Sequence, residues 1–248
     1  MSSVKQVELD FTLTMHANFH IGSGAGMAGM ADRVVLRMAN KELVIPASTV
    51  KGRTRYHCEQ LARALDIGIC GGRATHAELC KDKGPPCLIC RLFGSEWRPS
   101  TLRFADACLV EALRHLVREQ HPSSTGFDYQ VVSHTRTRLN RLLRRVEEGA
   151  LFTFEEGVKG LTFAGRIAGT LLCVETTVAD IPLEVLALVA ALRLVDRVGG
   201  KKTIGLGACT ITVDNLIVDH KTVTTSLYEV SDKDIEELIL YDDYRRSA

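Results

Sequence analysis

The sequence has no long hydrophobic run. Its 248 residues contain no apolar segment that approaches the roughly 20 residues a helix needs to span a bilayer. The first residues, MSSVKQVELDF, lack the apolar region of a signal peptide. We therefore expect a soluble, cytoplasmic protein with no membrane partner.

The sequence also has little net charge. Its formal charge is only +1, whereas a nucleic-acid-binding protein that acts alone is usually more basic. The charges are unevenly placed, because residues 133–146 contain five arginines and no acid, while residues 231–243 are mostly acidic. A polarised surface of this kind suits head-to-tail stacking of copies, with a basic stripe left for a polyanion. Two solvated faces are the plainer alternative.

Motifs for nucleotide hydrolysis and Ser/His/Asp catalysis are missing as well. The glycine-rich segment 199–207 (GGKKTIGLG) lacks the Gly-Lys-Ser/Thr ending of a Walker loop, and it precedes a strand pattern rather than a helix. Gly199 and Gly200 would let backbone amides approach a phosphate, and Lys201 and Lys202 add positive charge. We expect contact with an RNA backbone here, with an ordinary turn as the alternative.

Cysteines, in contrast, are concentrated in one segment. The chain has eight, and Cys70, Cys80, Cys87 and Cys90 lie within 21 residues together with His76. In a protein that is not exported, such clustering favours metal binding over disulfides. We predict a structural zinc site with His76, Cys80, Cys87 and Cys90 as ligands, and Cys70 as the substitute for His76. Loop cysteines without a metal are the alternative.

A second basic motif lies at the start of a predicted helix. Ser48, Lys51 and Arg55 are spaced i, i+3, i+7 and share one helix face, and Arg53 stands between them in sequence. We expect Ser48 to act as N-cap and the helix start to attract a phosphate. These residues are therefore predicted to bind RNA, and a solvated helix face is the alternative.

The hydrophobic pattern predicts an α+β fold. The expected order is strand, helix, strands, helix, strand, which is that of a ferredoxin-like βαββαβ unit, also the scaffold of RNA-recognition domains. We expect one domain over 1–248, with a turn-like zinc-binding insertion over 70–92 and a second insertion over 112–148. The predicted strands are 7–15, a short hairpin of 34–38 with 43–45, 102–110, 151–158, 161–176 and 208–218, and the predicted helices are 46–68, 182–198 and 232–240.

Four segments in order resemble the RAMP superfamily, and more narrowly the backbone subunit of type III CRISPR effector complexes. They are IPASTVKGRTR, the CxxC that runs into CRLFG, RTRLNRLLRRVEEGALFTFE, and GGKKTIGLGAC. The resemblance implies a ferredoxin-like core, copies that stack along a guide RNA (crRNA), and other CRISPR effector subunits as partners. It also implies a β-hairpin thumb, so the arginine-rich insertion with Arg136 and Arg138 corresponds to the thumb region.

The same resemblance implies that the protein cleaves RNA. Active members of the family cut the bound target RNA with one aspartate in the loop after the first strand, in a metal-dependent reaction. Asp32 ends the glycine-rich loop 21–32 and takes that place. A carboxylate there can bind a divalent ion such as Mg²⁺, or orient a ribose 2′-hydroxyl. The alternative is that Asp32 only caps or turns the entry to the next strand.

The sequence leaves three functions in competition. The first is a guide-binding subunit that cleaves complementary target RNA, and the second is a non-catalytic RNA-coating subunit of the same complex. The third is a ribonuclease of the same fold that processes guide precursors alone. Near-neutral charge and the zinc motif disfavour the third.

Overall fold

A computed structural model describes most of the chain. The described residues are 2–24, 26, 31–70, 80, 86–96, 98–114, 129–140, 142–174, 181–223 and 232–247. His76 and Arg141, both singled out by the sequence, lie outside these ranges. Within them, no helix is both long enough and apolar enough to cross a membrane.

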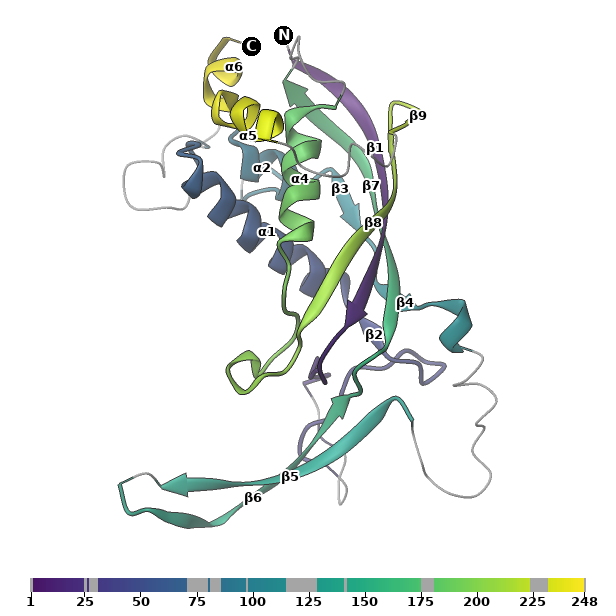
Figure 1. Ribbon diagram of the computed structural model, residues 1–248, viewed down its shortest axis with the longest axis vertical. Coiled ribbons are helices and arrows are strands. Elements are labelled where there is room, and N and C mark those ends of the chain that lie inside the picture. Colours follow the sequence, from purple (N-terminus) through teal and green to yellow (C-terminus); the bar gives the residue numbers. More distant parts are fainter. Residues whose placement is uncertain are drawn as a thin grey trace.

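An antiparallel sheet forms the body of the molecule (Figure 1). Its central strand, β1 (Ser2–Met15), pairs with β7 (Thr162–Val174) on one side and with β8 (Cys209–Val218) on the other. The strand order is β2-β4-β7-β1-β8-β9, and β3 also pairs with β7. The short strands are β2 (Val44–Ile45), β3 (Leu102–Phe104), β4 (Ala107–Leu109) and β9 (Lys221–Thr222).

Alternation along β1 gives the sheet its two faces. Leu9 and Phe11 are buried, whereas Glu8 and Asp10 point to the other side. Among the described residues, the main helices lie on the buried face (Figure 1). They are α1 (Ala47–Ala64), α2 (Leu88–Phe93) and α4 (Leu183–Arg193), and α5 (Asp232–Ile239) and α6 (Tyr241–Ser247) lie close to one end of them.

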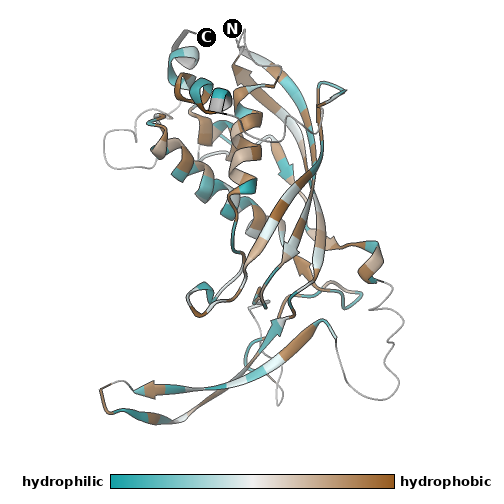
Figure 2. Cartoon of the chain, viewed as in Figure 1, coloured by the Kyte–Doolittle hydropathy of each residue, from teal (hydrophilic) through white to brown (hydrophobic). Residues whose placement is uncertain are grey.

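Helix α4 is buried almost completely in the core. Every residue from Leu183 to Leu192 is buried, which accounts for its almost uniformly apolar sequence. Figure 2 shows this helix as largely hydrophobic along its length. The helix predicted over 182–198 is thus a core helix, but it ends at Arg193, five residues earlier than expected.

One charged pair is buried among these helices. Arg91 on α2 donates to the Glu184 carboxylate on α4 at 3.1 Å, and Glu184 Oε1 also accepts from the Tyr241 hydroxyl of α6 at 3.1 Å. Burial raises the pKa of Glu184 above its ordinary value. Because a buried charge without its partner is costly, this network holds α2, α4 and α6 in one arrangement.

A separate two-stranded sheet projects from the body (Figure 1). It is the hairpin of β5 (Val131–Asn140) and β6 (Arg145–Gly157). Its tip carries exposed apolar side chains, since Leu142 is 92% exposed and Leu139 64%. A lone hairpin is at best marginally stable in water, so contacts at its base must hold it.

The expected mixed α/β character with antiparallel strands is confirmed. The predicted short hairpin of 34–38 with 43–45 is reduced to one antiparallel bridge between Arg37 and Leu43, and β2 pairs with β4 instead. Segment 151–158 belongs to β6 and pairs with β5, not with the strand that follows it. The stretch expected to be turn-like over 70–90 ends in the buried helix α2.

Candidate nucleic-acid interface and cysteine cluster

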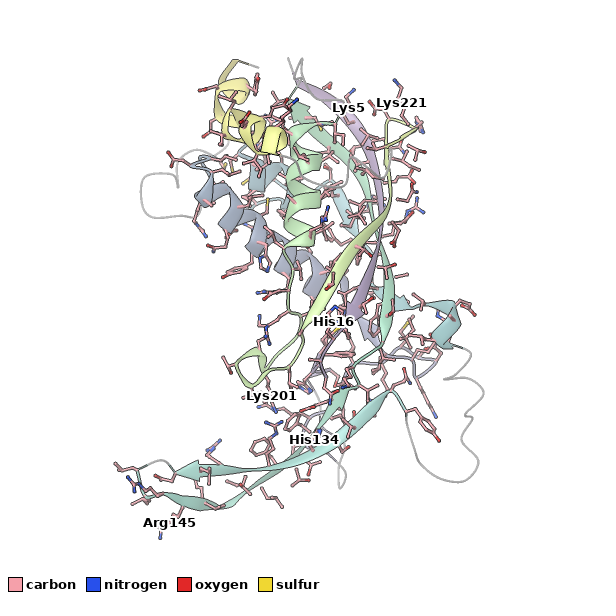
Figure 3. All side chains as sticks on the ribbon, viewed as in Figure 1. Lys5, His16, His134, Arg145, Lys201 and Lys221 are labelled. Carbon is pink, nitrogen blue, oxygen red and sulfur yellow. The ribbon has the colours of Figure 1, made fainter. Side chains whose placement is uncertain are left out.

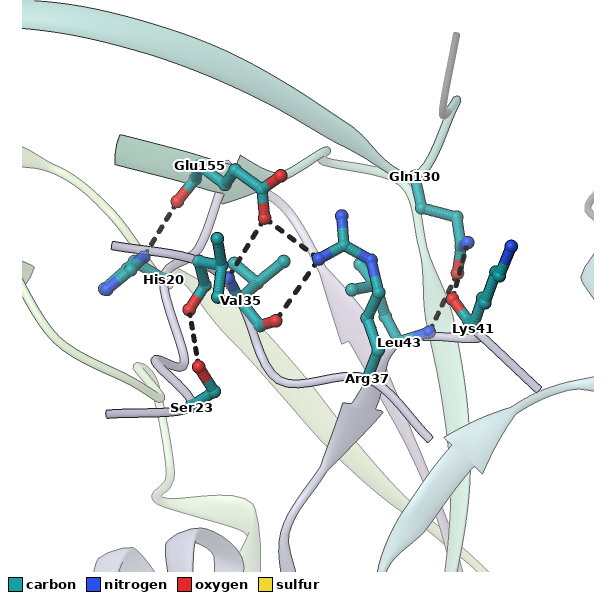
Figure 4. A network of polar contacts seen from close by, with 9 residues as sticks. His20, Ser23, Val35, Arg37, Lys41, Leu43, Gln130 and Glu155 are labelled. Atoms are coloured by element: carbon teal, nitrogen blue, oxygen red, sulfur yellow. Dashed lines mark hydrogen bonds and ion pairs between the residues drawn. The ribbon is translucent and has the colours of Figure 1, made fainter. Parts of the chain in front are cut away.

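Polar contacts from segment 20–43 hold the base of the hairpin (Figure 4). The Glu155 carboxylate accepts from the Val35 amide at 3.2 Å and from the Arg37 guanidinium at 2.9 Å. The Glu155 carbonyl oxygen lies 2.8 Å from His20 Nδ1. These contacts fix the base of the hairpin to the body, although its tip projects away.

Asp32 lies against this hairpin base. Its amide donates to the Thr153 carbonyl at 2.8 Å, and its Oδ2 accepts from the Thr153 amide at 2.7 Å. The residue is exposed. Asp32 is therefore held in place against β6. One of its carboxylate oxygens accepts a backbone hydrogen bond, which is the structural role that the alternative to catalysis assigned to this residue.

The glycine-rich segment 199–207 owes some of its glycines to packing within the chain. Gly199 and Gly207 have φ of +80° and +81°, and a Cβ there would lie 2.6 Å from the His20 carbonyl oxygen and 2.0 Å from that of Val198. The Gly200 amide donates to the His20 carbonyl at 2.8 Å. That amide is thus not available for a phosphate, and positive charge comes from the lysines.

Lys201 faces the base of the hairpin (Figure 3). Its Nζ lies 3.0 Å from the centroid of the Phe154 ring, and the Arg136 guanidinium lies 4.9 Å from the same centroid. Desolvation lowers the pKa of Lys201, and the charges of Arg136 and Arg33 lower it further. Two cations therefore lie over one aromatic ring and the charge of Arg33 also acts on Lys201, which is an arrangement suited to an anionic ligand.

One buried acid balances part of this charge. Glu156 is 2% exposed, and its carboxylate lies 3.4 Å from Arg136 and 3.5 Å from His134 Nε2. Further out on the hairpin, Arg138 is more exposed and pairs with Glu147 at 3.7 Å. The base of the hairpin is therefore more ordered by ion pairs than its outer part.

Lys202 turns toward helix α1 instead. Desolvation lowers its pKa, and the charge of Arg53 adds to that effect. Arg53 donates from Nε to the Arg197 carbonyl at 2.9 Å and lies 3.0 Å from His57 Nε2. Two consecutive lysines thus extend into two cationic clusters, one at the hairpin and one on α1.

The start of α1 differs from the prediction. The helix begins at Ala47, its N-cap is Pro46, and the Asp106 carboxylate accepts from the Ala47 amide at 2.7 Å. Ser48 is therefore not the N-cap, because the extended segment ends at Pro46, two residues earlier than expected. A carboxylate also already occupies the end of the helix where a phosphate was expected.

Lys51 and Arg55 lie together, as their spacing indicated, but they contact the protein. Lys51 Nζ is 5.7 Å from the Phe104 ring centroid, and Arg55 pairs with Glu59 at 3.0 Å and donates to the Gly94 carbonyl. Desolvation, aided by the Arg55 charge, lowers the pKa of Lys51. Their side of the helix differs from that of Arg53.

Four cysteines form a compact cluster elsewhere in the body. The Sγ atoms of Cys70, Cys80, Cys87 and Cys90 all lie within 4.8 Å of one another, which brings Cys70 into the set. A tetrahedral zinc site with bonds of about 2.3 Å would place its sulfurs about 3.8 Å apart. The cluster can hold a metal ion, and whether His76 joins it lies outside the described residues.

The ionisation of these thiols fits a cation site. A hydrogen bond from Cys90 lowers the pKa of Cys87 to about 4, while burial raises the pKa of Cys70 to about 12. The protein alone therefore stabilises one thiolate and disfavours more, because like charges at this distance repel. A bound divalent cation would supply the charge that lets further thiols ionise.

Several residues at these sites were missed by sequence reasoning. Arg33, Phe154, His57 and Arg197 gave no motif, because they come from distant segments that only the fold brings to Lys201 and Lys202. Of these four, only His57 could have been found from the sequence, since it lies i+4 from Arg53 and so shares its helix face.

Comparisons with known proteins agree with this architecture. The family model of the RAMP superfamily matches residues 12–210. The chain is similar to one in the cryo-EM structure of the type III-B Cmr-beta bound to cognate target RNA, with 15% identity, a TM-score of 0.54, and coverage of 83% of this chain and 96% of that one. It is also similar to one in the apo-state structure of the type III-B Cmr-beta, with 14% identity, a TM-score of 0.51, and coverage of 84% and 97%. A comparison with curated proteins gives no match.

Proposed function

The chain belongs to the RAMP superfamily, and we propose that it is a guide-RNA-binding backbone subunit of a type III CRISPR ribonucleoprotein complex. The similar chains belong to type III-B Cmr-beta structures, one of them bound to cognate target RNA. Guide RNA, target RNA, further copies of the chain and other effector subunits are the proposed partners.

The fold supports this proposal in its details. The order β4-β7-β1-β8, with α1 between β1 and β4 in sequence and α4 between β7 and β8, suits a ferredoxin-like core within one domain over 1–248. The projecting hairpin suits the role of a thumb, proposed for the insertion over 112–148. The cysteine cluster suits a structural zinc site in the insertion over 70–92.

One observation carries the RNA-binding role. Lys201 and Lys202 are adjacent, yet one joins Arg33 and Arg136 at the hairpin and the other joins Arg53 on α1. They link two elements far apart in sequence into one basic surface, although the chain is nearly neutral overall. Phosphates repeat along an RNA strand, so a surface with several spaced cations can grip consecutive phosphates.

Binding of single-stranded RNA to charge-removal variants tests this role. Lys201→Ala should weaken binding about equally for RNAs of different sequence, since phosphate contacts do not read bases. The slope of log affinity against log salt should fall by about 0.7 for each phosphate that the variant no longer neutralises. Lys221→Ala is the matched control, because Lys221 lies on exposed β9 at the other end of the sheet (Figure 3). Equal losses in both variants, or a sequence-selective loss, would contradict the proposal.

Cleavage of the paired target RNA is the second part of the proposal, with Asp32 as the acting residue. Asp32 supplies one carboxylate, so a Mg²⁺ ion there would complete its shell with water and RNA phosphate oxygens. Such an ion, when bound, would neutralise charge that develops on the phosphate. The non-catalytic alternative draws support from the hydrogen bond between Asp32 and the Thr153 amide, which is a sufficient structural role for this residue.

A further inference from the structure

Asp196 occupies the centre of the cationic cluster on α1. It lies in the turn after α4, and its Oδ1 is 3.6 Å from Arg53 Nη2 and 3.8 Å from His57 Nε2. Its Oδ2 is 4.0 Å from Arg197 Nε. Among the described residues, Asp196 is the acid that these three cationic or titratable groups share.

These contacts are loose. All three distances exceed that of a normal charge-assisted hydrogen bond, which is about 2.7–2.9 Å. The Asp196 side chain is 67% exposed, whereas those of Arg53 and His57 are 19% and 16% exposed. The cations are therefore held by the fold, while the carboxylate can turn toward solvent without breaking a tight pair.

The cations do not depend on Asp196 for their positions. Arg53 Nε donates to the Arg197 carbonyl at 2.9 Å, and Arg197 Nη1 donates to the Lys202 carbonyl at 3.4 Å. The Arg53 guanidinium also lies 5.0 Å from the Tyr56 ring centroid. Backbone and ring contacts thus preorganise an anion site that stays built when the carboxylate leaves.

His57 is neutral in this arrangement. Arginine nitrogens only donate, so at 3.0 Å from Arg53 Nη2 the His57 Nε2 atom must accept and carries no proton. The groups that face His57 are Arg53 and Tyr56 on α1, and Asp196 and Lys202 from the segment after α4. Desolvation and the charges of Arg53 and Lys202 lower its pKa, against the raising effect of Asp196.

We propose that Asp196 is an internal competitor for an RNA phosphate at a site formed by Arg53, His57, Arg197 and Lys202, and that His57 takes up a proton when the phosphate displaces it. The inference rests on the proposed RNA-binding function and adds the residues that tune it. A phosphodiester oxygen in the place of Asp196 Oδ1 would accept from both Arg53 and a protonated His57 Nε2, and these two bonds would replace the hydrogen bond that Arg53 Nη2 donates to the neutral ring.

RNA binding and protonation of His57 should favour each other. A bound phosphate raises the pKa of His57, so the complex binds a proton more tightly than the free protein does. RNA affinity should therefore rise as pH falls through the window between the lowered pKa of the free chain and the higher pKa of the complex. A rise of one pKa unit corresponds to about tenfold in affinity.

Fluorescence anisotropy with oligouridine as probe tests both the competition by Asp196 and the proton uptake by His57, since uracil does not titrate between about pH 5.5 and 8. At pH 7.5, Asp196→Asn should bind about threefold to tenfold more tightly than the unaltered chain, from the loss of the two weak competing pairs with Arg53 and Arg197. Asp214→Asn is the matched control, because it removes the same charge on the face of the sheet that the helices leave open. Lowering the pH to 5.5 should strengthen binding by the unaltered chain about threefold to tenfold more than binding by His57→Gln.

The outcomes separate the two proposals. Tighter binding by Asp196→Asn alone, with a pH response that depends on His57, supports the inference. Equal gains in the Asp196 and Asp214 variants would show a general charge effect and overturn it, as would an identical pH response in His57→Gln. If the unaltered chain bound no oligouridine at all, the proposed function itself would fail, and the inference with it.

Discussion

Two substitutions at Asp32 separate a catalytic carboxylate from a structural one. Asp32→Asn keeps an oxygen that can accept from the Thr153 amide, now 2.7 Å from Oδ2, but removes the negative charge. Asp32→Ala removes both the charge and the hydrogen bond. Comparison of the two variants therefore separates the effect of the negative charge from the effect of the hydrogen bond.

The expected magnitudes follow from these contacts. Loss of the single hydrogen bond in Asp32→Ala should lower the free energy of unfolding by about 1 kcal/mol, and Asp32→Asn should change it little. If the carboxylate acts on the RNA, both variants should lose cleavage by about 100-fold to 10,000-fold, as expected when a group that orients or deprotonates a nucleophile is removed. Assembly, guide content and target affinity should not change.

The assay uses the assembled complex and an end-labelled RNA complementary to the guide, with and without a chelator. Cleavage by the unaltered protein should require a divalent ion, and stacked copies should give cuts at a regular spacing. Asp32→Asn that cuts as fast as the unaltered protein would refute the catalytic role. Loss of cleavage in Asp32→Ala but not in Asp32→Asn would show that the hydrogen bond to β6, and not the charge, is what matters.

Two further predictions concern the cysteine cluster and the glycine-rich segment. Elemental analysis should give about one zinc per chain. The zinc should be lost in Cys70→Ser and retained in His76→Ala, because the Cys70 sulfur lies within 4.8 Å of the three other cysteine sulfurs. The reverse result would identify His76 as the ligand instead of Cys70. Gly207→Ala should lower the free energy of unfolding by about 2–4 kcal/mol in urea denaturation, since its Cβ would lie 2.0 Å from a carbonyl oxygen. Gly205→Ala, with φ +93° and nothing within 4 Å, should cost only about 1 kcal/mol, and equal costs would contradict the steric argument.

The sequence predicts best where one face of an element is buried. The alternation in 7–15 and the apolar run in 182–198 correspond to β1 and to α4, because burial selects side chains with the period of each element. The hydrophobic pattern gave no sign of the β5–β6 hairpin, which only the family resemblance implied, since most of β5 is exposed and its side chains need not alternate. Exposure thus removes the signal on which sequence reading depends.

The site shows the same limit. Cysteines at short spacing were recognisable, because ligand geometry restricts their separation along the chain. The choice between Cys70 and His76 was not, since either spacing can close a tetrahedral site. Likewise, Asp106 replaces Ser48 at the start of α1, and nothing in a sequence indicates a capping residue that lies 59 residues away.

The position of β1 at the centre of the sheet has a consequence for biosynthesis. This strand leaves the ribosome long before its partners, because Ser2 pairs with Val174 and Met15 with Cys209. At about 5–20 residues per second, the ribosome needs roughly 10–40 s to deliver both neighbours. Until β7 emerges, both hydrogen-bonding edges of β1 lack their partners, and one edge stays uncovered until β8 follows. We therefore expect the nascent chain to depend on a holding chaperone, and a chain released before β8 is complete to aggregate instead of folding.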